Sequence, residues 1–386
     1  MSKILNQINY GKQWIDDSDI QAVAEALRSD FLTQGPRVAE FEEMLCEATG
    51  ARYCVAVANG TAALHLAVAS LELPHGAEGI TSPITFVATS NAMAYCGMQP
   101  RFADIDPATG LIDPDEIVMQ ITGKTSLIAP VHYAGQPCDM ESISAIARER
   151  NIYIIEDAAH AIGSRYPSGD AVGSCKYSDM TTFSFHPVKT MTTGEGGAIT
   201  TNNKELYEKL QMLRSHGITK DPDRLEQNDG PWYYEMHELG YNYRITDIQC
   251  ALGISQLRKL GMFAGRRREI AAMYDEAFAG IDWLRPLSEL PGNHSAWHLY
   301  VLKFDFEKIG KSRAEVMEIL RERKIGTQVH YIPVHQQPYY RKKFVYEAGN
   351  YPRAEKFYEQ ILSIPLFPAM VKEDVDYVIE AISELR

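Results

Sequence analysis

One lysine stands in a setting that could support covalent chemistry. Lys189 follows a predicted strand, Thr181 to Phe185, in a polar loop that ends in the glycine cluster Gly194 to Gly197. An amine held there could attack an aldehyde and form a Schiff base, although most loop lysines are only solvated. The glycine cluster matches neither a Walker A loop nor a dinucleotide fingerprint. It indicates close packing of the backbone around a bulky group.

Asp157 lies at the C-terminal end of the predicted buried strand Tyr153 to Glu156, and ligands of open α/β sheets bind at that edge. Opposite charges ~3–4 Å apart, at an effective dielectric of ~20, attract by roughly 4–5 kcal/mol. Since one pKa unit corresponds to about 1.4 kcal/mol, a carboxylate there could keep a pyridine nitrogen protonated. Asp157 could instead cap the next helix, and only one of Glu156 and Asp157 must face the site. His160 could touch the same ring or belong to the core.

A phosphate site is indicated by the Gly60-Thr61 turn between a predicted strand and a predicted helix. Backbone N–H groups at a helix start bind phosphate, and Gly60 allows a close approach. Ser184 could add a hydroxyl group to the same phosphate. Phe86 could stack on a ring, although an isolated Phe is more often part of the core.

Together these residues describe a pyridoxal phosphate site. It has a lysine for the aldehyde, a carboxylate for the ring nitrogen, an N–H cradle for the phosphate and an aromatic cover. The combination carries more weight than any single member. In such a site the ring is the electron sink, and the protein sets its orientation and protonation.

The composition limits the other functional classes. The chain has 386 residues, of which 45% are hydrophobic and 23% charged, which is typical of a soluble globular protein of two or three domains. Its 38 Lys and Arg and 51 Asp and Glu give a net charge of −13, so a nucleic-acid partner is not expected. No apolar run is long enough to cross a membrane. The six scattered cysteines fit a reducing compartment, so we expect a cytoplasmic protein with no membrane partner.

Continuous apolar strands that alternate with helices indicate an α/β protein with a sheet covered on both faces. After Gly240 the pattern changes to a smaller α+β unit. We therefore expect a large domain of residues 1–260 and a small C-terminal domain of residues 261–386.

Three local features of the second half carry further expectations. The spacing of apolar residues predicts one amphipathic helix from Ile245 to Phe278 and a strand at Thr327–Tyr331. The basic run Arg266–Arg268 is interpreted as a solvated helix face.

Six motifs are spread over the chain: LTQGP (Leu32–Pro36), ANGTAAL (Ala58–Leu64), EDAAH (Glu156–His160), SFHPVK (Ser184–Lys189), TTGEGG (Thr192–Gly197) and GYNYRITDIQCALG (Gly240–Gly253). In combination they resemble the DegT/DnrJ/EryC/StrS family of sugar aminotransferases. The resemblance covers nearly the whole chain. It implies the type I, aspartate-aminotransferase-like fold and a pyridoxal-5'-phosphate-dependent transaminase.

The resemblance also implies roles for individual residues. Lys189 would bind the cofactor aldehyde covalently, Asp157 would pair with the pyridine nitrogen, and His160 would lie by the phenolic oxygen. The phosphate would be bound by Gly60, Thr61 and Ser184 of one subunit and by Asn242 of the partner subunit. The active enzyme would then be a homodimer with its sites at the interface.

Two segments, 231–249 and 330–341, are most similar to the branch of the family that acts in the pseudaminic acid pathway. This resemblance implies amino transfer from L-glutamate to C4 of UDP-2-acetamido-2,6-dideoxy-β-L-arabino-hex-4-ulose. The product would be UDP-4-amino-4,6-dideoxy-N-acetyl-β-L-altrosamine. The family's substrate contacts would fall on Tyr10, Leu32, Thr33, Gln34, Gly35, Arg244, His330, Tyr331, Ile332 and Pro333. The lysine itself departs from the family's dehydratase branch, which has histidine in its place.

Three alternatives stay open at this point. The substrate could be another nucleotide-linked keto sugar, such as a dTDP- or GDP-linked one, or the chain could be a cofactor-binding sensor without turnover. A zinc hydrolase is disfavoured, because Tyr241 occupies the last position of an H-E-x-x-H pattern that starts at His237. The pair His294 and His298 has no intervening Glu and is interpreted as structural, so no metal is expected.

Overall fold

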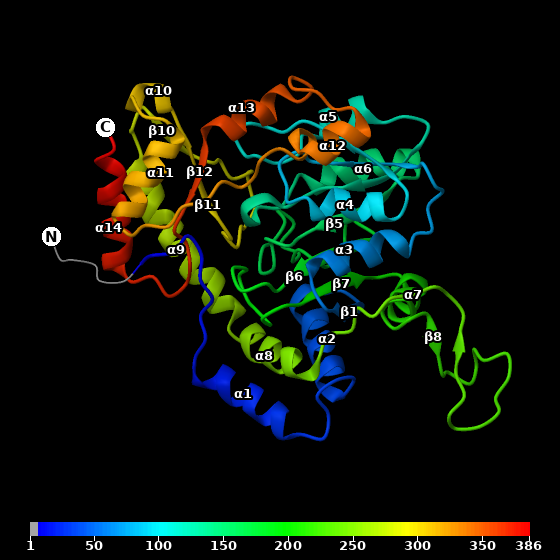
Figure 1. The fold of residues 1–386 in the computed structure, drawn as a ribbon. Coiled ribbons are helices and arrows are strands. Elements are labelled where there is room, and N and C mark those ends of the chain that lie inside the picture. Colours follow the sequence, from blue (N-terminus) through cyan, green and yellow to red (C-terminus); the bar gives the residue numbers. More distant parts are fainter. Residues whose placement is uncertain (1–6) are drawn as a thin grey trace.

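Seven strands form the sheet that carries most of the predicted site, in the order β1-β7-β6-β5-β4-β2-β3 (Figure 1). The structure is a computed structural model that describes residues 7–386. The strands are β1 (Tyr53–Val57), β2 (Glu78–Thr81), β3 (Gln99–Phe102), β4 (Thr125–Ala129), β5 (Tyr153–Asp157), β6 (Met180–Ser184) and β7 (Gly197–Thr201). All neighbours pair in parallel except β7, which is antiparallel to both β1 and β6. The predicted mostly parallel sheet is confirmed.

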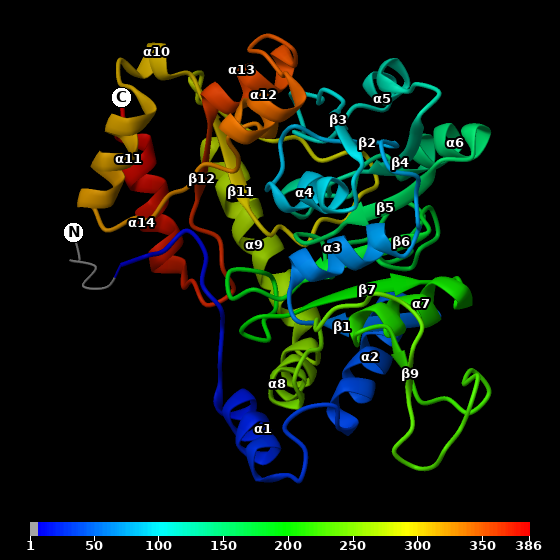
Figure 2. The same ribbon diagram turned by 45° about the vertical axis from the view of Figure 1, so that its right-hand side comes forward.

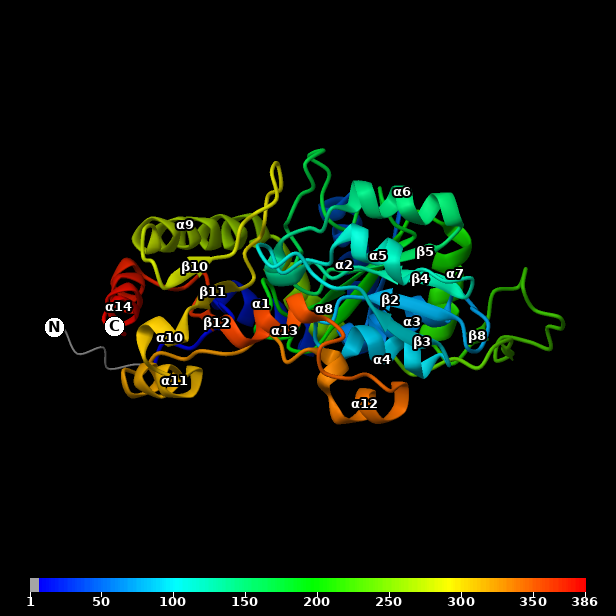
Figure 3. The ribbon, with the colours of Figure 1, turned by 90° about the horizontal axis from the view of Figure 1, so that it is seen from above.

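Helices cover both faces of this sheet, which explains why its strands are apolar throughout (Figures 2 and 3). One face packs against α2 (Pro36–Thr49), α5 (Pro114–Gln120), α6 (Met140–Arg150) and α8 (Asp247–Leu257). The other face packs against α3 (Gly60–Ala69), α4 (Ala88–Tyr95) and α7 (Lys204–Arg214). Side chains alternate between the two faces, so Cys54 and Ala56 enter the first core while Val55 and Val57 enter the second.

A second, antiparallel sheet has three strands in the order β10-β11-β12. They are β10 (Leu284–Pro286), β11 (Tyr300–Phe304) and β12 (Ile361–Ile364). The helices that share a separate hydrophobic core with it are α9 (Leu260–Phe278), α10 (Phe306–Ile309), α11 (Arg313–Glu322) and α14 (Lys372–Ser383). The predicted α+β unit at the C-terminal end of the chain is therefore present.

Two C-terminal helices return to the large sheet, α12 (Pro338–Phe344) and α13 (Pro352–Gln360) (Figure 1). The Tyr340 hydroxyl donates to Asn91 Oδ1 at 2.6 Å, and the backbone N–H of Arg353 donates to Asp104 Oδ2 at 2.9 Å. The last third of the chain thus contributes to a core of the large sheet and to the core of the small sheet. The division at residue 260 stays a prediction.

The single helix predicted from Ile245 to Phe278 is wrong, because α8 ends at Leu257 and α9 begins at Leu260. The two helices contribute to different cores, α8 to that of the large sheet and α9 to that of the small sheet. Lys259 lies at this junction, and its Nζ contacts Asp19 Oδ2 at 2.7 Å. Asp19 belongs to α1 (Asp17–Arg28), which packs against α8.

Two further expectations about the C-terminal part are also wrong. The segment Thr327–Tyr331 is not a strand; it makes one isolated bridge, between Gln328 and Ser363, and then turns toward the large sheet. The run Arg266–Arg268 is not a wholly solvated face, because the Arg267 side chain is fully buried. Arg267 Nη1 donates to the carbonyl oxygens of Trp297, His298 and Leu366 at 2.8–3.2 Å.

Within residues 7–386 no helix has both the length and the apolar character needed to cross a bilayer. The six cysteines are all free thiols. The compartment predicted from them stays a prediction.

Candidate active site

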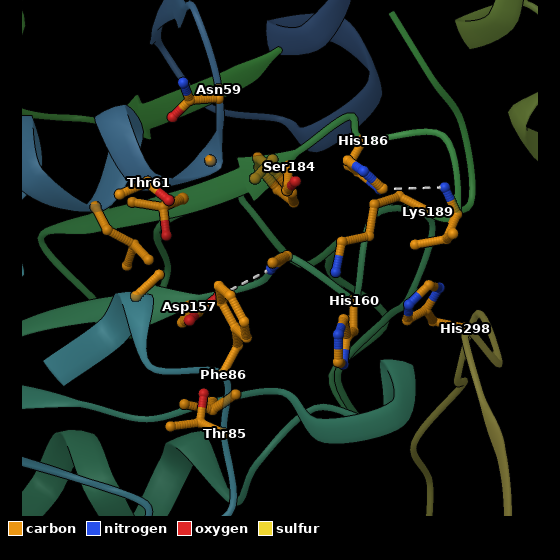
Figure 4. Close-up of a pocket in the computed structure, with 18 of the residues that line it drawn as sticks. Asn59, Thr61, Thr85, Phe86, Asp157, His160, Ser184, His186, Lys189 and His298 are labelled. Atoms are coloured by element: carbon orange, nitrogen blue, oxygen red, sulfur yellow. Dashed lines mark hydrogen bonds between the residues drawn. The ribbon is translucent and has the colours of Figure 1, made fainter. Parts of the chain in front are cut away.

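A cavity of about 610 Å³ lies where β1, β5 and β6 end (Figure 4). This volume is typical of a small-molecule site. Ten of the predicted site residues line it: Tyr10, Gly60, Thr61, Phe86, Asp157, His160, Ser184, Lys189, His330 and Tyr331. Residues that are up to about 320 positions apart in the chain therefore meet at the edge of the sheet where ligands are expected.

Lys189 is presented by the loop that joins β6 to β7. The backbone of Phe185 bonds to Gly196 at 2.8 Å and to Thr193 at 3.0 Å, which closes the loop. The Lys189 N–H donates to the His186 carbonyl at 2.8 Å, and the amino group points into the cavity (Figure 4). Burial lowers the pKa of Lys189 to about 8, although the nearby Asp157 charge acts in the opposite direction. Near neutral pH a useful fraction of the amine is therefore uncharged and nucleophilic.

The last two residues of β5 are both acidic, and they face opposite sides of the sheet. Asp157 faces the cavity, where its Oδ2 accepts from the Thr89 hydroxyl at 2.6 Å and its Oδ1 from the Ala159 N–H at 3.1 Å. Glu156 points away from it and accepts four hydrogen bonds, from His132, Tyr166, Ser178 and Thr181. Of these two carboxylates, Asp157 is therefore the one that lines the cavity.

The start of α3 forms a cradle for an anion. Asn59 caps this helix by accepting the Ala62 N–H at 2.8 Å, and the N–H groups of Gly60 and Thr61 precede the intrahelical hydrogen bonds. A Cβ on Gly60 would lie 2.8 Å from the Ser184 Cβ, so only glycine allows helix and strand to approach this closely. The positive end of the helix, two N–H groups and the Ser184 hydroxyl suit a phosphate.

Histidine and tyrosine side chains form the remaining wall of the cavity. His160 Nε2 lies 3.1 Å from the Tyr331 hydroxyl, and the His160 and His298 rings are 4.3 Å apart. The Nδ1 atoms of both histidines are buried without a hydrogen-bond partner among the described residues. Burial lowers the pKa of both, and the Lys189 charge adds to this effect. Neutral rings with an unused ring nitrogen are suited to contact a bound molecule.

The pyridoxal phosphate predicted from the sequence fits this arrangement. Lys189 and Asp157 lie on the same cavity, the α3 cradle offers room for phosphate, and Phe86 borders the space between them (Figure 4). No group of three or more His, Cys, Asp or Glu within the described part of the chain could hold a metal ion.

Several residues of the cavity wall were missed by the sequence interpretation, namely Thr85, His186, Glu195, Tyr243 and His298. The sequence interpretation assigned His298 a structural role with His294, because no Glu lies between the two residues. Residues 291–299 are not helical, and a loop places His298 on the cavity. His186 lies within the SFHPVK motif and Glu195 within the TTGEGG motif. Membership of these two motifs was the signal that could have identified them.

Eight predicted substrate or cofactor residues do not line this cavity: Leu32, Thr33, Gln34, Gly35, Asn242, Arg244, Ile332 and Pro333. Six of them lie in two adjoining segments, Leu32–Gly35 and Asn242–Arg244. Thr33 bridges to Thr246, and the Gly35 N–H donates to Asp247 Oδ2 at 2.8 Å. Ile332 and Pro333 follow Tyr331 on the opposite side of the site, where the Val334 N–H donates to the Pro83 carbonyl.

The segment around Asn242 is extended and pairs with β1, through the bridge between Arg244 and Val57. The Tyr241 and Tyr243 rings stack at 5.0 Å, so they share one side of the segment. Asn242 and Arg244 therefore lie on the other side, because alternate side chains of an extended chain point in opposite directions. Tyr243 lines the cavity, and its two neighbours face away from it.

Comparisons with known proteins identify the family of the chain. The DegT/DnrJ/EryC1/StrS aminotransferase family model matches residues 13–383. The spore coat polysaccharide biosynthesis protein SpsC of Bacillus subtilis is 43% identical over 97% of this chain and 96% of its own.

Two solved structures superimpose over almost the whole chain. PseC of Helicobacter pylori, an aminotransferase involved in the biosynthesis of pseudaminic acid, has a TM-score of 0.91 at 33% identity and covers 98% of this chain and 99% of its own. The putative sugar aminotransferase Spr1654 of Streptococcus pneumoniae, solved in its pyridoxal phosphate form, has a TM-score of 0.90 at 32% identity and covers 98% of both chains. The chain has the type I fold and belongs to the DegT/DnrJ/EryC1/StrS family of pyridoxal-phosphate-dependent sugar aminotransferases.

Proposed function

We propose that this sugar aminotransferase moves the amino group of L-glutamate to C4 of UDP-2-acetamido-2,6-dideoxy-β-L-arabino-hex-4-ulose. The products would be 2-oxoglutarate and UDP-4-amino-4,6-dideoxy-N-acetyl-β-L-altrosamine. The observation that carries the aminotransfer part is that Lys189 and Asp157 line one cavity beside an anion cradle. The likeness to PseC supports the choice of sugar.

When bound, pyridoxal phosphate supplies an electron sink for the charge left at an α-carbon that loses its proton. In this proposal the Lys189 amine would remove that proton from the donor amino acid and deliver it to the carbon that carried the cofactor's aldehyde. When the keto sugar accepts the amino group, Lys189 would move a proton in the opposite direction. The lowered pKa of Lys189 leaves part of the amine unprotonated for this role near neutral pH. Asp157 would keep the ring nitrogen protonated, and the start of α3 with Ser184 would hold the phosphate.

The nucleotide sugar brings negative charge to a protein whose net charge is −13. Local cations must therefore bind it, and among residues 7–386 of the single chain no arginine lines the cavity. We infer that Asn242 and Arg244 serve the cavity of the partner subunit in a homodimer, because both point away from their own. Leu32 to Gly35, which adjoin this segment, would contribute to the same surface.

An exposed arm supports the dimer. It joins the short strands β8 (Ile218–Thr219) and β9 (Glu235–Met236), and it projects from the large sheet (Figure 1). Trp232 in this arm is 70% exposed, and Leu239, shortly after β9, is 81% exposed. Large apolar side chains that are this exposed are typical of an interaction surface. A second copy of this chain would cover them.

A second candidate substrate is a different nucleotide-linked keto sugar. The observation in its favour is that SpsC, whose printed role concerns spore coat polysaccharide, is 43% identical to this chain, against 33% for PseC. The fold and the cofactor pocket would be the same in either case, since these contacts do not involve the sugar.

A panel of keto sugars tests the choice. The enzyme, loaded with pyridoxal phosphate and supplied with L-glutamate, would be offered UDP-, dTDP- and GDP-linked 4-keto and 3-keto sugars, and amino-sugar formation would be followed by mass spectrometry. The proposal expects the highest kcat/KM with the UDP-linked 4-keto-N-acetyl sugar. A higher value with any other member would replace it with that substrate.

A further inference from the structure

We propose that Thr89 is a positioning residue for Asp157: through a directed chain of two hydroxyl groups, it fixes the carboxylate and thereby favours protonation of the cofactor's ring nitrogen. This inference rests on the proposed function in one respect, the pairing of Asp157 with that nitrogen. The contacts that carry it belong to this chain alone.

Thr89 lies behind the cavity, in the first turn of α4, and its side chain is fully enclosed by protein, with 1% of the residue exposed. Its hydroxyl lies 2.6 Å from Asp157 Oδ2. This distance is typical of a charge-assisted O–H···O⁻ hydrogen bond, which is about twice as strong as a neutral one. An ionised carboxylate can only accept, so the hydroxyl proton of Thr89 is directed at Asp157.

The direction of the next hydrogen bond follows from the first. The hydroxyl groups of Thr85 and Thr89 are 3.0 Å apart, and geometry alone would allow either to donate. Because Thr89 has one hydroxyl proton and uses it on Asp157, Thr85 must be the donor. The chain therefore runs from Thr85 through Thr89 to Asp157, and hydrogen bonds in such a chain strengthen one another.

The opposite oxygen of Asp157 is held as well. Oδ1 accepts the Ala159 N–H at 3.1 Å. With one donor on each oxygen, the carboxylate cannot rotate without losing a hydrogen bond. Asp157 itself contributes to the wall of the cavity. The orientation that the ring nitrogen would meet is thus set before any ligand enters.

Thr89 also acts on the charge. A hydrogen bond to the ionised form of a carboxylate favours that form. In a carboxylate–pyridinium pair, loss of the donor would shift the shared proton from the ring nitrogen toward Asp157. Since a hydrogen bond to a charged group is worth about one to two powers of ten in an equilibrium, the ratio of protonated to unprotonated nitrogen should fall at least about tenfold.

The test uses the whole protein loaded with pyridoxal phosphate that is labelled with ¹⁵N in the ring. The ¹⁵N chemical shift reports directly on protonation and does not depend on turnover. Thr89→Val and Thr89→Ala both remove the hydroxyl, and the smaller Ala keeps the test possible where Val does not fold. Thr89→Ser retains the hydroxyl. Ser90→Ala is the matched control, since it removes a buried hydroxyl from the next position of α4, one that bonds to the Val87 carbonyl at 3.2 Å.

The expected result is a protonated nitrogen in the wild type, Thr89→Ser and Ser90→Ala, and a shift toward the unprotonated position in Thr89→Val and Thr89→Ala. A nitrogen that stays equally protonated in the wild type and in both hydroxyl-free variants would overturn the role of Thr89 and leave the proposed function standing. An unprotonated nitrogen in the wild type would overturn the pairing of Asp157 and this inference together.

Discussion

Asp157 at the end of β5 and the segment at Asn242–Arg244 both lie near the cavity, yet their polar groups differ in their hydrogen bonding. Asp157 accepts two hydrogen bonds from its own chain before any ligand binds. At the segment, Asn242 is exposed, and both it and Arg244 face away from the cavity. In the proposed homodimer, Asp157 would be fixed by its own subunit, whereas Asn242 and Arg244 would reach the ligands bound by the partner subunit.

Removing Lys189 should have the largest effect on turnover, because it disables the cofactor pocket and leaves Asn242 and Arg244 intact. Lys189→Ala is expected to lower turnover by at least about a thousandfold, since both proton transfers lose their base. Binding of the cofactor should persist through the α3 cradle and Asp157, without a covalent link. Steady-state rates and mass spectrometry after borohydride reduction would measure the two effects. Lys204→Ala, on the exposed start of α7, is the control; turnover that survives in Lys189→Ala would refute the assignment.

The two adjacent carboxylates of β5 should respond in different ways. Asp157→Asn is expected to lower turnover by about a hundredfold or more because the ring nitrogen loses its partner. Glu156→Gln should instead lower thermal stability, by about 1–3 kcal/mol, because a buried acceptor of four hydrogen bonds is impaired.

Kinetics and thermal unfolding of both variants would check this pair. Each variant serves as the control for the other. The account would be contradicted by a Glu156→Gln protein of normal stability and poor turnover.

Mixing two impaired variants tests whether Asn242 and Arg244 act across the proposed dimer. The double variant Asn242→Ala/Arg244→Ala should lose activity by roughly tenfold to a hundredfold, through contacts to the partner's bound ligand. When it is unfolded and refolded together with Lys189→Ala, half of the dimers should be mixed, and activity should return to about a quarter of the wild-type value.

This recovery arises because each mixed dimer has one site with an intact Lys189 facing an intact Asn242 and Arg244. Each variant taken alone through the same refolding is the control. If no activity returns, Asn242 and Arg244 act within their own subunit or not at all.

The smallest expected effect is a shift along the pH axis. Burial lowers the pKa of Lys189 to about 8, from 10.5 for an ordinary lysine. Covalent uptake of pyridoxal phosphate by the apoprotein should therefore accelerate by about tenfold per pH unit below pH 8 and level off above it. In Asp157→Asn the charge that raises this pKa is removed, so the plateau should begin at a lower pH. Stopped-flow absorbance would measure both curves, and a rate that keeps rising to pH 10 would show that Lys189 is not buried as described.

Sequence patterns could predict the residues of the cofactor pocket because they lie at or shortly after the ends of strands. Lys189, Asp157 and Gly60 each follow a short apolar run, and parallel strands bring such positions to one edge. Thr89 and Asp157 are 68 positions apart, and no local pattern marks such a pair. The same holds for His298, which a loop places on the cavity.

Errors in the second half of the chain have a common physical origin. Arg267 lies between two arginines that reach the surface, so nothing in the local sequence marks it as buried. Its burial depends on three carbonyl oxygens that distant segments supply. The division of residues 245–278 into α8 and α9 reflects packing onto two different cores. Helical periodicity continues through that junction, and the sequence therefore does not mark it.

The measurement that tests the central claim most directly is the absorbance spectrum of the pyridoxal-phosphate-loaded protein, recorded before and after L-glutamate and again after the UDP-linked 4-keto sugar. The account predicts that glutamate abolishes the yellow colour of the lysine-linked cofactor and that the keto sugar restores it, in the wild type but not in Lys189→Ala. A yellow protein whose spectrum responds to neither compound would contradict the proposed reaction.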